Sequence, residues 1–191
     1  MTDITSNIWF TSDHHFGHKN IICFSNRPFT DVFDMDEALI EQWNAVVGIK
    51  DTVYHLGDIF FCPSSEARLL RERLNGSIHL IRGNHDKGAD SIRDAFEWIK
   101  DIHELTIDNA DAEAGKQRIT LCHYAMRVWN HSHHGAWHLY GHSHGSLEDD
   151  THSLSFDVGV DCHNFQPISY KTVKDIMSAK TFTPIDHHGR N

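Results

Sequence analysis

The sequence lacks the features that would place it in a membrane or in an oxidising compartment. Its apolar runs are short, and none approaches the roughly 18 residues that span a bilayer. The N-terminal segment MTDITSNIWF has no basic stretch followed by a long apolar run, so we expect no secretory signal and a cytoplasmic protein. The 4 cysteines lie far apart and form no C-x-x-C pair, which favours reduced thiols over a disulfide framework.

Basic residues and linkers are also scarce. The chain has 17 Lys and Arg residues against 27 Asp and Glu residues, a formal net charge of −10. General nucleic-acid binding and attachment to an anionic membrane both need a basic face, so we expect neither. No repeat and no Pro-, Ser- or Gly-rich linker divides the 191 residues. We therefore expect a single domain over residues 1–191, with a polar, mobile tail from about residue 180.

Histidine, in contrast, is abundant. The chain has 18 histidines, whereas a background share of about 2% would supply only about four. They are scattered from His14 to His188 in runs no longer than two, which excludes an expression tag. Because imidazole is the commonest metal ligand in proteins, the excess points to chemistry rather than to chance.

The first half of the chain alternates short apolar runs with helical patterns. Strands are expected at 8–12, 52–56 and 78–82. Helices are expected after a capping box at Asp34 and at 64–74 and 90–99. This β-α-β-α-β-α order favours a parallel sheet packed between helices. The second half predicts a hairpin of 103–107 with 117–122, strands at 137–140 and 153–160, and a helix from Pro167 to about 178. The sum is an α/β layered sandwich with enough strands for two sheets.

Polar residues follow five of these strands at the point where each strand ends. They occur as Asp13-His14-His15, Gly57-Asp58, Gly83-Asn84-His85-Asp86, Cys122-His123 and Gly141-His142-Ser143-His144. Because ligands bind outside the carboxyl ends of strands in α/β sheets, we expect one convergent site. The preceding glycines permit tight turns that aim the side chains over the sheet edge.

Seven of these residues offer oxygen or imidazole donors and no thiolate. They are Asp13, His15, Asp58, Asn84, His123, His142 and His144. Seven donors exceed the need of one structural zinc and suit two divalent ions about 3.5–4 Å apart that share a carboxylate. Asp58 is the natural bridge because it lies in the middle of the set. Mixed nitrogen and oxygen donors favour manganese, the first choice, or iron, nickel, cobalt or zinc, over calcium and magnesium.

The motif order D-x-H, G-D, G-N-H-D, H, G-H-x-H resembles that of the calcineurin-like metallophosphoesterases. Its five blocks span residues 13 to 144. The segments NRPF (26–29) and RVWNHSHHGAWHLYGHSHG (127–145) resemble the compact bacterial and phage branch that has no separate cap domain. The resemblance implies a four-layer α-β-β-α sandwich with two mixed β-sheets flanked by helices, in agreement with the order of elements above.

The resemblance also implies a role for each motif residue. The first metal would be held by Asp13, His15 and His144, the second by Asn84, His123 and His142, with Asp58 as the bridge. His85 would donate a proton to the leaving oxygen, and Asp86 would orient His85. The implied reaction is hydrolysis of a phosphate ester by a hydroxide that bridges the metals, with His85 as general acid.

The substrate is less constrained than the site. Phosphodiesters are favoured over monoesters because uncapped relatives tend that way, and a phosphatase of the same fold is the alternative. A non-catalytic protein-binding scaffold is a third reading, which the presence of His85 and all seven ligands disfavours. A phosphate-ester small molecule, a nucleotide or a nucleic-acid end all fit, and the oligomeric state stays open.

Further basic residues lie beside the motifs. Arg27, Arg82 and Arg127 are candidates for binding the substrate phosphate, since guanidinium matches phosphate oxygens bidentately. The alternative for Arg82 is a side chain that faces solvent or pairs with an acid. Nine further histidines have open roles. His14 and His18 either touch substrate or lie in a surface loop, and His55 and His79 are expected to be packed within strands. The cluster of His131, His133 and His134 is expected in a loop near the site. His187 and His188 are expected to be solvated in the tail.

Overall fold

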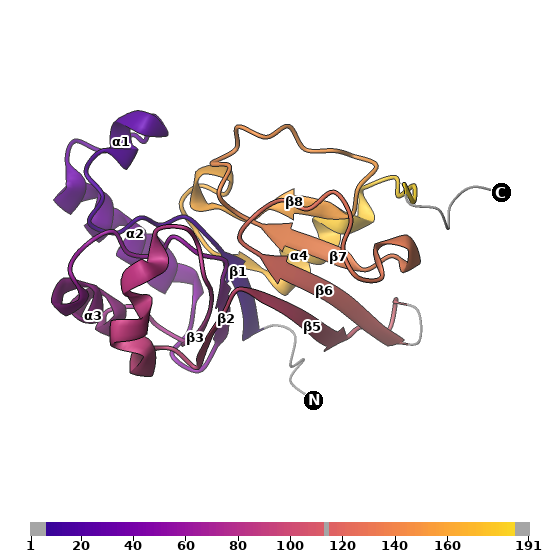
Figure 1. The fold of residues 1–191 in the computed structure, drawn as a ribbon, viewed down its shortest axis with the longest axis horizontal. Coiled ribbons are helices and arrows are strands. Elements are labelled where there is room, and N and C mark those ends of the chain that lie inside the picture. Colours follow the sequence, from indigo (N-terminus) through magenta and orange to yellow (C-terminus); the bar gives the residue numbers. More distant parts are fainter. Residues whose placement is uncertain (1–6, 113–114, 186–191) are drawn as a thin grey trace.

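The computed structural model describes residues 7–112 and 115–185, which form two β-sheets with helices packed around them (Figure 1). The first sheet has the strand order β4-β3-β2-β1-β9. Its strands are β1 (Ile8–Thr11), β2 (Thr52–His55), β3 (Ser77–Ile81), β4 (Trp98–Lys100) and β9 (Ile168–Ser169). The first four are parallel to one another, as the β-α-β order predicts, and β9 is antiparallel to β1.

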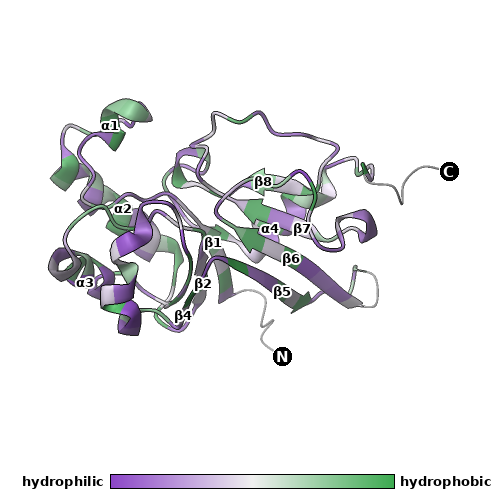
Figure 2. Ribbon diagram, in the orientation of Figure 1, coloured by the Kyte–Doolittle hydropathy of each residue, from purple (hydrophilic) through white to green (hydrophobic). Residues whose placement is uncertain are grey.

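The second sheet has the order β5-β6-β7-β8 and is also mixed. Its strands are β5 (Ile102–Asp108), β6 (Lys116–Cys122), β7 (Trp137–Tyr140) and β8 (Ser155–Asp157). The expected hairpin is confirmed, because β5 and β6 are antiparallel neighbours, whereas β6, β7 and β8 run parallel. Figure 2 shows β6 hydrophilic where it leaves the hairpin loop and hydrophobic toward its carboxyl end, the end that is fully buried.

The helical elements cover the sheets. They are α1 (Ile21–Phe24), α2 (Val32–Val46), α3 (Ser64–Glu72), α4 (Tyr170–Ser178) and the 3-10 segments η2 (Asp86–Ala95), η4 (Ser132–His134) and η5 (Val160–Cys162). One hydrophobic cluster packs α2, α3 and η2 on one face of the first sheet, with Trp43 of α2 fully buried. A second cluster fills the space between the sheets, where Phe10, Leu121 and Val173 of α4 are completely buried. The predicted α/β sandwich of two mixed sheets and helices is thereby confirmed.

The expected helix over 90–99 is wrong in its second half. The chain forms η2 up to Ala95 and then β4, which pairs in parallel with β3. Ile92 and Ile99 mimic a helical period, but β4 places Ile99 in the first cluster and Trp98 against the second. Pairing with β3 and burial on both faces of the sheet outweigh the local pattern.

Two helix starts also differ from the expectation. Asp31, rather than Asp34, caps α2, since its carboxylate accepts a hydrogen bond from the Asp34 amide. Pro167 does not begin the last helix, because residues 168–169 pair with β1 first and Ser169 then caps α4. The strand expected at 153–160 is shortened to β8. Residues 186–191 of the expected mobile tail, which include His187 and His188, lie outside the described residues.

None of the helices in the described ranges combines the length and the apolar character required to cross a membrane.

Candidate dinuclear metal centre

The predicted ligands converge at the carboxyl ends of strands from both sheets. The first sheet supplies them after β1, β2 and β3, and the second sheet after β6 and β7. The loops are tied to one another through the backbone: the Asp13 amide donates to the Gly57 carbonyl at 3.0 Å, and the Gly141 amide donates to the His123 carbonyl at 3.0 Å. The site therefore spans the junction of the two sheets, where five separate chain segments meet.

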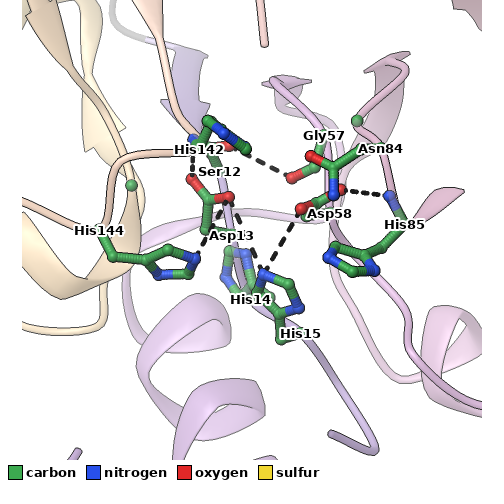
Figure 3. Close-up of polar contacts among 12 residues, drawn as sticks. Ser12, Asp13, His14, His15, Gly57, Asp58, Asn84, His85, His142 and His144 are labelled. Atoms are coloured by element: carbon green, nitrogen blue, oxygen red, sulfur yellow. Dashed lines mark hydrogen bonds and ion pairs between the residues drawn. The ribbon is translucent and has the colours of Figure 1, made fainter. Parts of the chain in front are cut away.

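A first cluster consists of Asp13, His15 and His144, whose ligand atoms all lie within 4.8 Å of one another. Asp13 Oδ1 is 4.0 Å from His15 Nε2 and 3.9 Å from His144 Nε2, and Figure 3 shows the three side chains pointing toward one another. Among the described residues, Asp13 Oδ1 and His15 Nε2 are buried and have no hydrogen-bond partner. A buried anionic oxygen without a donor is costly unless a cation satisfies it. These atoms therefore fit a metal ion.

A second cluster consists of Asp58, His123 and His142, and its ligand atoms also lie within 4.8 Å of one another. Asn84 joins it, since its Oδ1 is 3.2 Å from His123 Nε2. This donor set holds two imidazoles, a carboxylate and an amide oxygen, the mixture that transition metals accept. His142 and Asn84 are exposed, so this cluster faces solvent.

Asp58 lies between the two clusters. Its Oδ2 is 3.6 Å from His15 Nε2 and 3.5 Å from His123 Nε2. Its other oxygen, Oδ1, accepts the His85 backbone amide at 2.9 Å, as drawn in Figure 3. One oxygen of Asp58 is thus placed to serve both clusters, while the second fixes the orientation of the carboxylate.

Two ligand histidines have their other ring nitrogen occupied by the protein. His123 Nδ1 lies 2.7 Å from the Leu56 carbonyl, and His144 Nδ1 lies 2.7 Å from Asp161 Oδ2. Because a carbonyl or carboxylate accepts the Nδ1 proton, Nε2 is left with its lone pair for a metal. The hydrogen bonds also fix the plane of each ring.

The pKa values of the two acids are shifted in opposite directions. Burial raises the pKa of Asp13 to about 7. Burial also acts to raise the pKa of Asp58, but the adjacent His123 imidazole and the His85 amide outweigh it and lower that pKa to about 2. Burial lowers the pKa of His15 to about 3, which keeps its imidazole neutral, the form that binds metal.

The ligands also adopt an uncommon backbone conformation. Positive φ angles occur at five of the seven, namely Asp13 (59°), His15 (53°), Asp58 (56°), His142 (70°) and His144 (49°). Non-glycine residues with positive φ are uncommon, and their strain is retained chiefly at functional sites. The neighbouring glycines allow this crowding: a Cβ on Gly83 would lie 2.1 Å from Asp58 Oδ1, and one on Gly141 would lie 2.5 Å from Asp13 Oδ2.

His85 is exposed beside the clusters, with its ring centroid 5.4 Å from that of His15. The carboxylate of Asp86 accepts hydrogen bonds from the backbone amides of Asp58 (2.7 Å), Ile59 (3.1 Å) and Gly83 (2.8 Å). Within the described chain these bonds go to the loops after β2 and β3 and not to the His85 ring. Asp86 therefore positions the loops that carry Asp58 and His85, a different task from the expected contact with the imidazole.

The three arginines lie in three different environments. Arg27 is buried and donates to Asp161 at 2.8 Å and to the carbonyls of Asp13 and His14. It therefore stabilises the loop that carries Asp13 and His15 through hydrogen bonds within the protein, which contradicts the expectation that it binds substrate. Arg82 pairs with Asp90 at 3.0 Å and with Asp101 at 3.4 Å, and Arg127 is exposed in the loop after β6.

The remaining histidines separate into a buried pair and a distant cluster. His14 and His55 are fully buried, with His14 Nδ1 2.9 Å from His55 Nε2, so His14 does not reach substrate. The cluster around His131 and His134 sits at the amino-terminal end of β7, opposite the end that carries the ligands. The expectation that it lies near the site is wrong. His18, in contrast, does border the site, with its Nδ1 3.3 Å from His15 Nδ1.

Asp161 was not predicted. Its carboxylate joins His144 Nδ1 and the Arg27 guanidinium, so it links the first cluster to a buried cation. In the sequence Asp161 follows Gly159 and Val160 and has no histidine or second acid directly beside it, so it does not match the pattern of the five motifs.

Comparison with known proteins agrees with this geometry. Residues 7–160 match the calcineurin-like phosphoesterase superfamily domain. The uncharacterized protein MJ1445 of Methanocaldococcus jannaschii is 35% identical over 177 residues, which cover 89% of this chain and 90% of that protein. The gene 66 protein of Mycobacterium phage L5 is 31% identical over 184 residues, which cover 82% of this chain and 87% of that protein.

A solved structure shares the fold. The protein of unknown function AQ665 from Aquifex aeolicus superposes with a TM-score of 0.64 at 23% identity, and the match covers 88% of this chain and 98% of that one. The family match covers all the ligand motifs, and the two clusters of His and Asp are consistent with a dinuclear metal site. This chain belongs to the calcineurin-like phosphoesterase superfamily.

Proposed function

We propose that this protein hydrolyses phosphodiesters at a centre of two divalent transition-metal ions, with manganese as the first candidate. The observation that carries the proposal is the position of Asp58 Oδ2, 3.6 Å from His15 Nε2 and 3.5 Å from His123 Nε2. A carboxylate oxygen shared by two clusters is the arrangement that a dinuclear centre requires. When bound, two such ions would lower the pKa of a coordinated water from 15.7 toward about 7 and neutralise phosphoryl charge.

The protein's own groups divide the remaining work. Asp13, Asp58 and the imidazoles of the two clusters would hold the ions, and His85 is exposed at the rim of the site. Water supplies the hydroxyl that bonds to phosphorus, and the bond from phosphorus to the ester oxygen breaks. His85 gives its proton to the leaving oxygen, while the proton released by water passes to solvent, which reprotonates His85.

The charge of the site supports a diester over a monoester. Arg27 is committed to Asp161, and Arg82 to Asp90 and Asp101. Neither is free to neutralise the second negative charge of a phosphate monoester. A diester carries one charge and needs no cation beyond the metal centre. We therefore place small phosphodiesters, diesters of nucleotides among them, first among the substrates, with monoester hydrolysis as the alternative.

The test is turnover of bis-p-nitrophenyl phosphate and p-nitrophenyl phosphate by the purified chain reconstituted with manganese, iron, nickel, cobalt or zinc. The expected result is a higher kcat/KM for the diester. Absence of turnover with every metal would overturn the enzymatic role and leave the scaffold reading, and a higher kcat/KM for the monoester would establish the phosphatase instead.

A variant of His85 tests the assignment of the acid. His85→Ala should lose about 10²–10⁴-fold in kcat, the usual contribution of general acid catalysis, and should keep two metal ions per chain. The matched control is His134→Ala, an exposed histidine at the far end of β7. Loss of metal from His85→Ala would show that His85 is a ligand rather than an acid.

A further inference from the structure

A cavity of about 310 Å³ opens directly beside His85. It lies between the loop after β2, the start of α3 and the 3-10 segment η2. Apolar side chains make up most of its wall, chiefly Phe60, Phe61, Pro63, Ala67, Ala89 and Ile92. Its volume falls in the range of roughly 300–1,000 Å³ that is usual for small-molecule pockets.

His85 connects this cavity to the metal clusters. Its side chain contributes to the cavity wall, while its backbone amide donates to Asp58 Oδ1 at 2.9 Å. The ring of Phe61 lies 5.1 Å from that of His85 and 3.9 Å from that of His18, in a stacked arrangement with the latter. An ester oxygen that receives a proton from His85 is therefore bonded to a group that lies in or at the mouth of the cavity.

The cavity is chemically unsuited to a charged group. Within the described part of the chain, no lysine or arginine lines it. Its one acid, Asp86, is buried and both of its carboxylate oxygens already accept hydrogen bonds from backbone amides. Phe61 is 43% exposed, which leaves aromatic surface for a ligand. A flat, uncharged, apolar group matches these walls, because it buries apolar surface and can contact the ring edge or face.

We propose that this cavity, termed here the Phe61 pocket (Phe60, Phe61, Pro63, Ala67, Ala89 and Ile92), binds an aromatic ring system on the alcohol that leaves the phosphoester. The proposal rests on the proposed function, because it assigns the leaving side of the reaction to the side of His85. It names the substrate class as phosphoesters whose leaving alcohol carries an aryl group or a nucleobase. Esters of small hydrophilic alcohols would gain nothing from this pocket.

The test uses uncharged aromatic alcohols as direct probes, so that it does not depend on catalysis. Phenol and adenosine are titrated into the protein loaded with zinc, which is diamagnetic, while the methyl resonances of Ala67, Ala89 and Ile92 are followed by NMR. Saturable shifts of these methyls are expected with at least one probe. Tighter binding of phenol identifies an aryl ester, and tighter binding of adenosine identifies a nucleoside ester; either result supports the pocket.

Two variants sharpen the test. Ala89→Leu should fill the pocket and weaken probe binding at least fivefold, whereas Ala179→Leu, at the exposed end of α4, should leave it unchanged. Because Ala89 is buried and a larger side chain there can impair folding, Phe61→Ala provides a second variant at a partly exposed position. It should also weaken binding of both probes at least fivefold while two metal ions and binding of inorganic phosphate are retained.

The two proposals fail separately. If these methyls do not shift with either probe, or if Phe61→Ala binds the probes as tightly as the wild type, the pocket assignment is overturned whether or not the protein hydrolyses phosphodiesters. If the methyls shift but no ester is hydrolysed with any metal, the pocket is an aromatic-binding site and the proposed function fails.

Discussion

The two clusters of candidate metal ligands share the Asp58 carboxylate but differ in the burial and the hydrogen bonding of their ligand atoms. In the first, Asp13 Oδ1 and His15 Nε2 are buried without a hydrogen-bond partner in the described chain, and burial raises the Asp13 pKa to about 7. In the second, hydrogen bonding and the charge of His123 overcome the burial of Asp58 and lower its pKa to about 2, and His142 is exposed. We infer that the first cluster would enclose its cation, whereas the second would leave its cation open to solvent and to a substrate.

The largest effect should come from removing the feature that the clusters share. Asp58→Asn takes away the negative charge that lies beside His15 and His123 and should reduce affinity for both ions. We expect a loss greater than the roughly 10–100-fold that follows removal of a group hydrogen-bonded to a metal ligand. Metal analysis after dialysis and calorimetric titration measure it. Retention of either ion at wild-type affinity would argue against the bridge.

Single-cluster variants should separate the two sites. Asp13→Asn should release the first ion, because the buried oxygen it changes faces both His15 and His144. His142→Ala should release only the second, leaving one ion per chain. Counting bound manganese in each variant checks the assignment. Equal loss of both ions from His142→Ala would mean that the clusters are not distinct sites.

A smaller loss of metal affinity is expected when the hydrogen-bond partner of a ligand in the first cluster is changed. Asp161→Asn removes the carboxylate that accepts the His144 Nδ1 proton and pairs with Arg27. Affinity for the first ion should fall by about 10–100-fold, and affinity for the second should not change. The readout is metal affinity rather than turnover. Equal weakening at both sites would instead point to a general loss of packing.

The smallest expected effect is a change in the pH dependence of folding stability that comes from a buried histidine outside both clusters. His138 is buried, its Nε2 accepts the Met126 amide at 3.1 Å and its Nδ1 lies 3.0 Å from the Thr120 carbonyl. Burial lowers the pKa of His138 below its ordinary value of 6.5. The unfolded chain therefore binds this proton more readily, and stability present above pH 6.5 is lost as the pH falls below it.

The control for this effect is His138→Gln, which keeps a donor and an acceptor but does not titrate. Urea unfolding of metal-free protein at pH 7.5 and pH 5 should show a larger drop in the free energy of unfolding for the wild type than for the variant. The same drop in both proteins would assign the pH dependence to other groups. The result separates packing histidines from ligand histidines, whose pH dependence should appear in metal affinity.

The clusters could be predicted from the sequence because each ligand lies within four residues of the end of a strand. Asp13, Asp58 and His123 follow short apolar runs, and parallel strands bring their carboxyl ends to one edge. Asp161 and Arg27 could not be predicted in their roles, since 134 residues separate them and only the folded chain brings their charges within 2.8 Å. The strand at Trp98 was hidden for the same reason: its pairing with β3 is not local.

The most direct test of the central claim is anomalous diffraction from crystals of the manganese-loaded protein. We expect two anomalous peaks about 3.5–4 Å apart, one beside Asp13, His15 and His144 and the other beside Asn84, His123 and His142, with Asp58 in contact with both. A single peak, or two peaks without Asp58 between them, would contradict the claim.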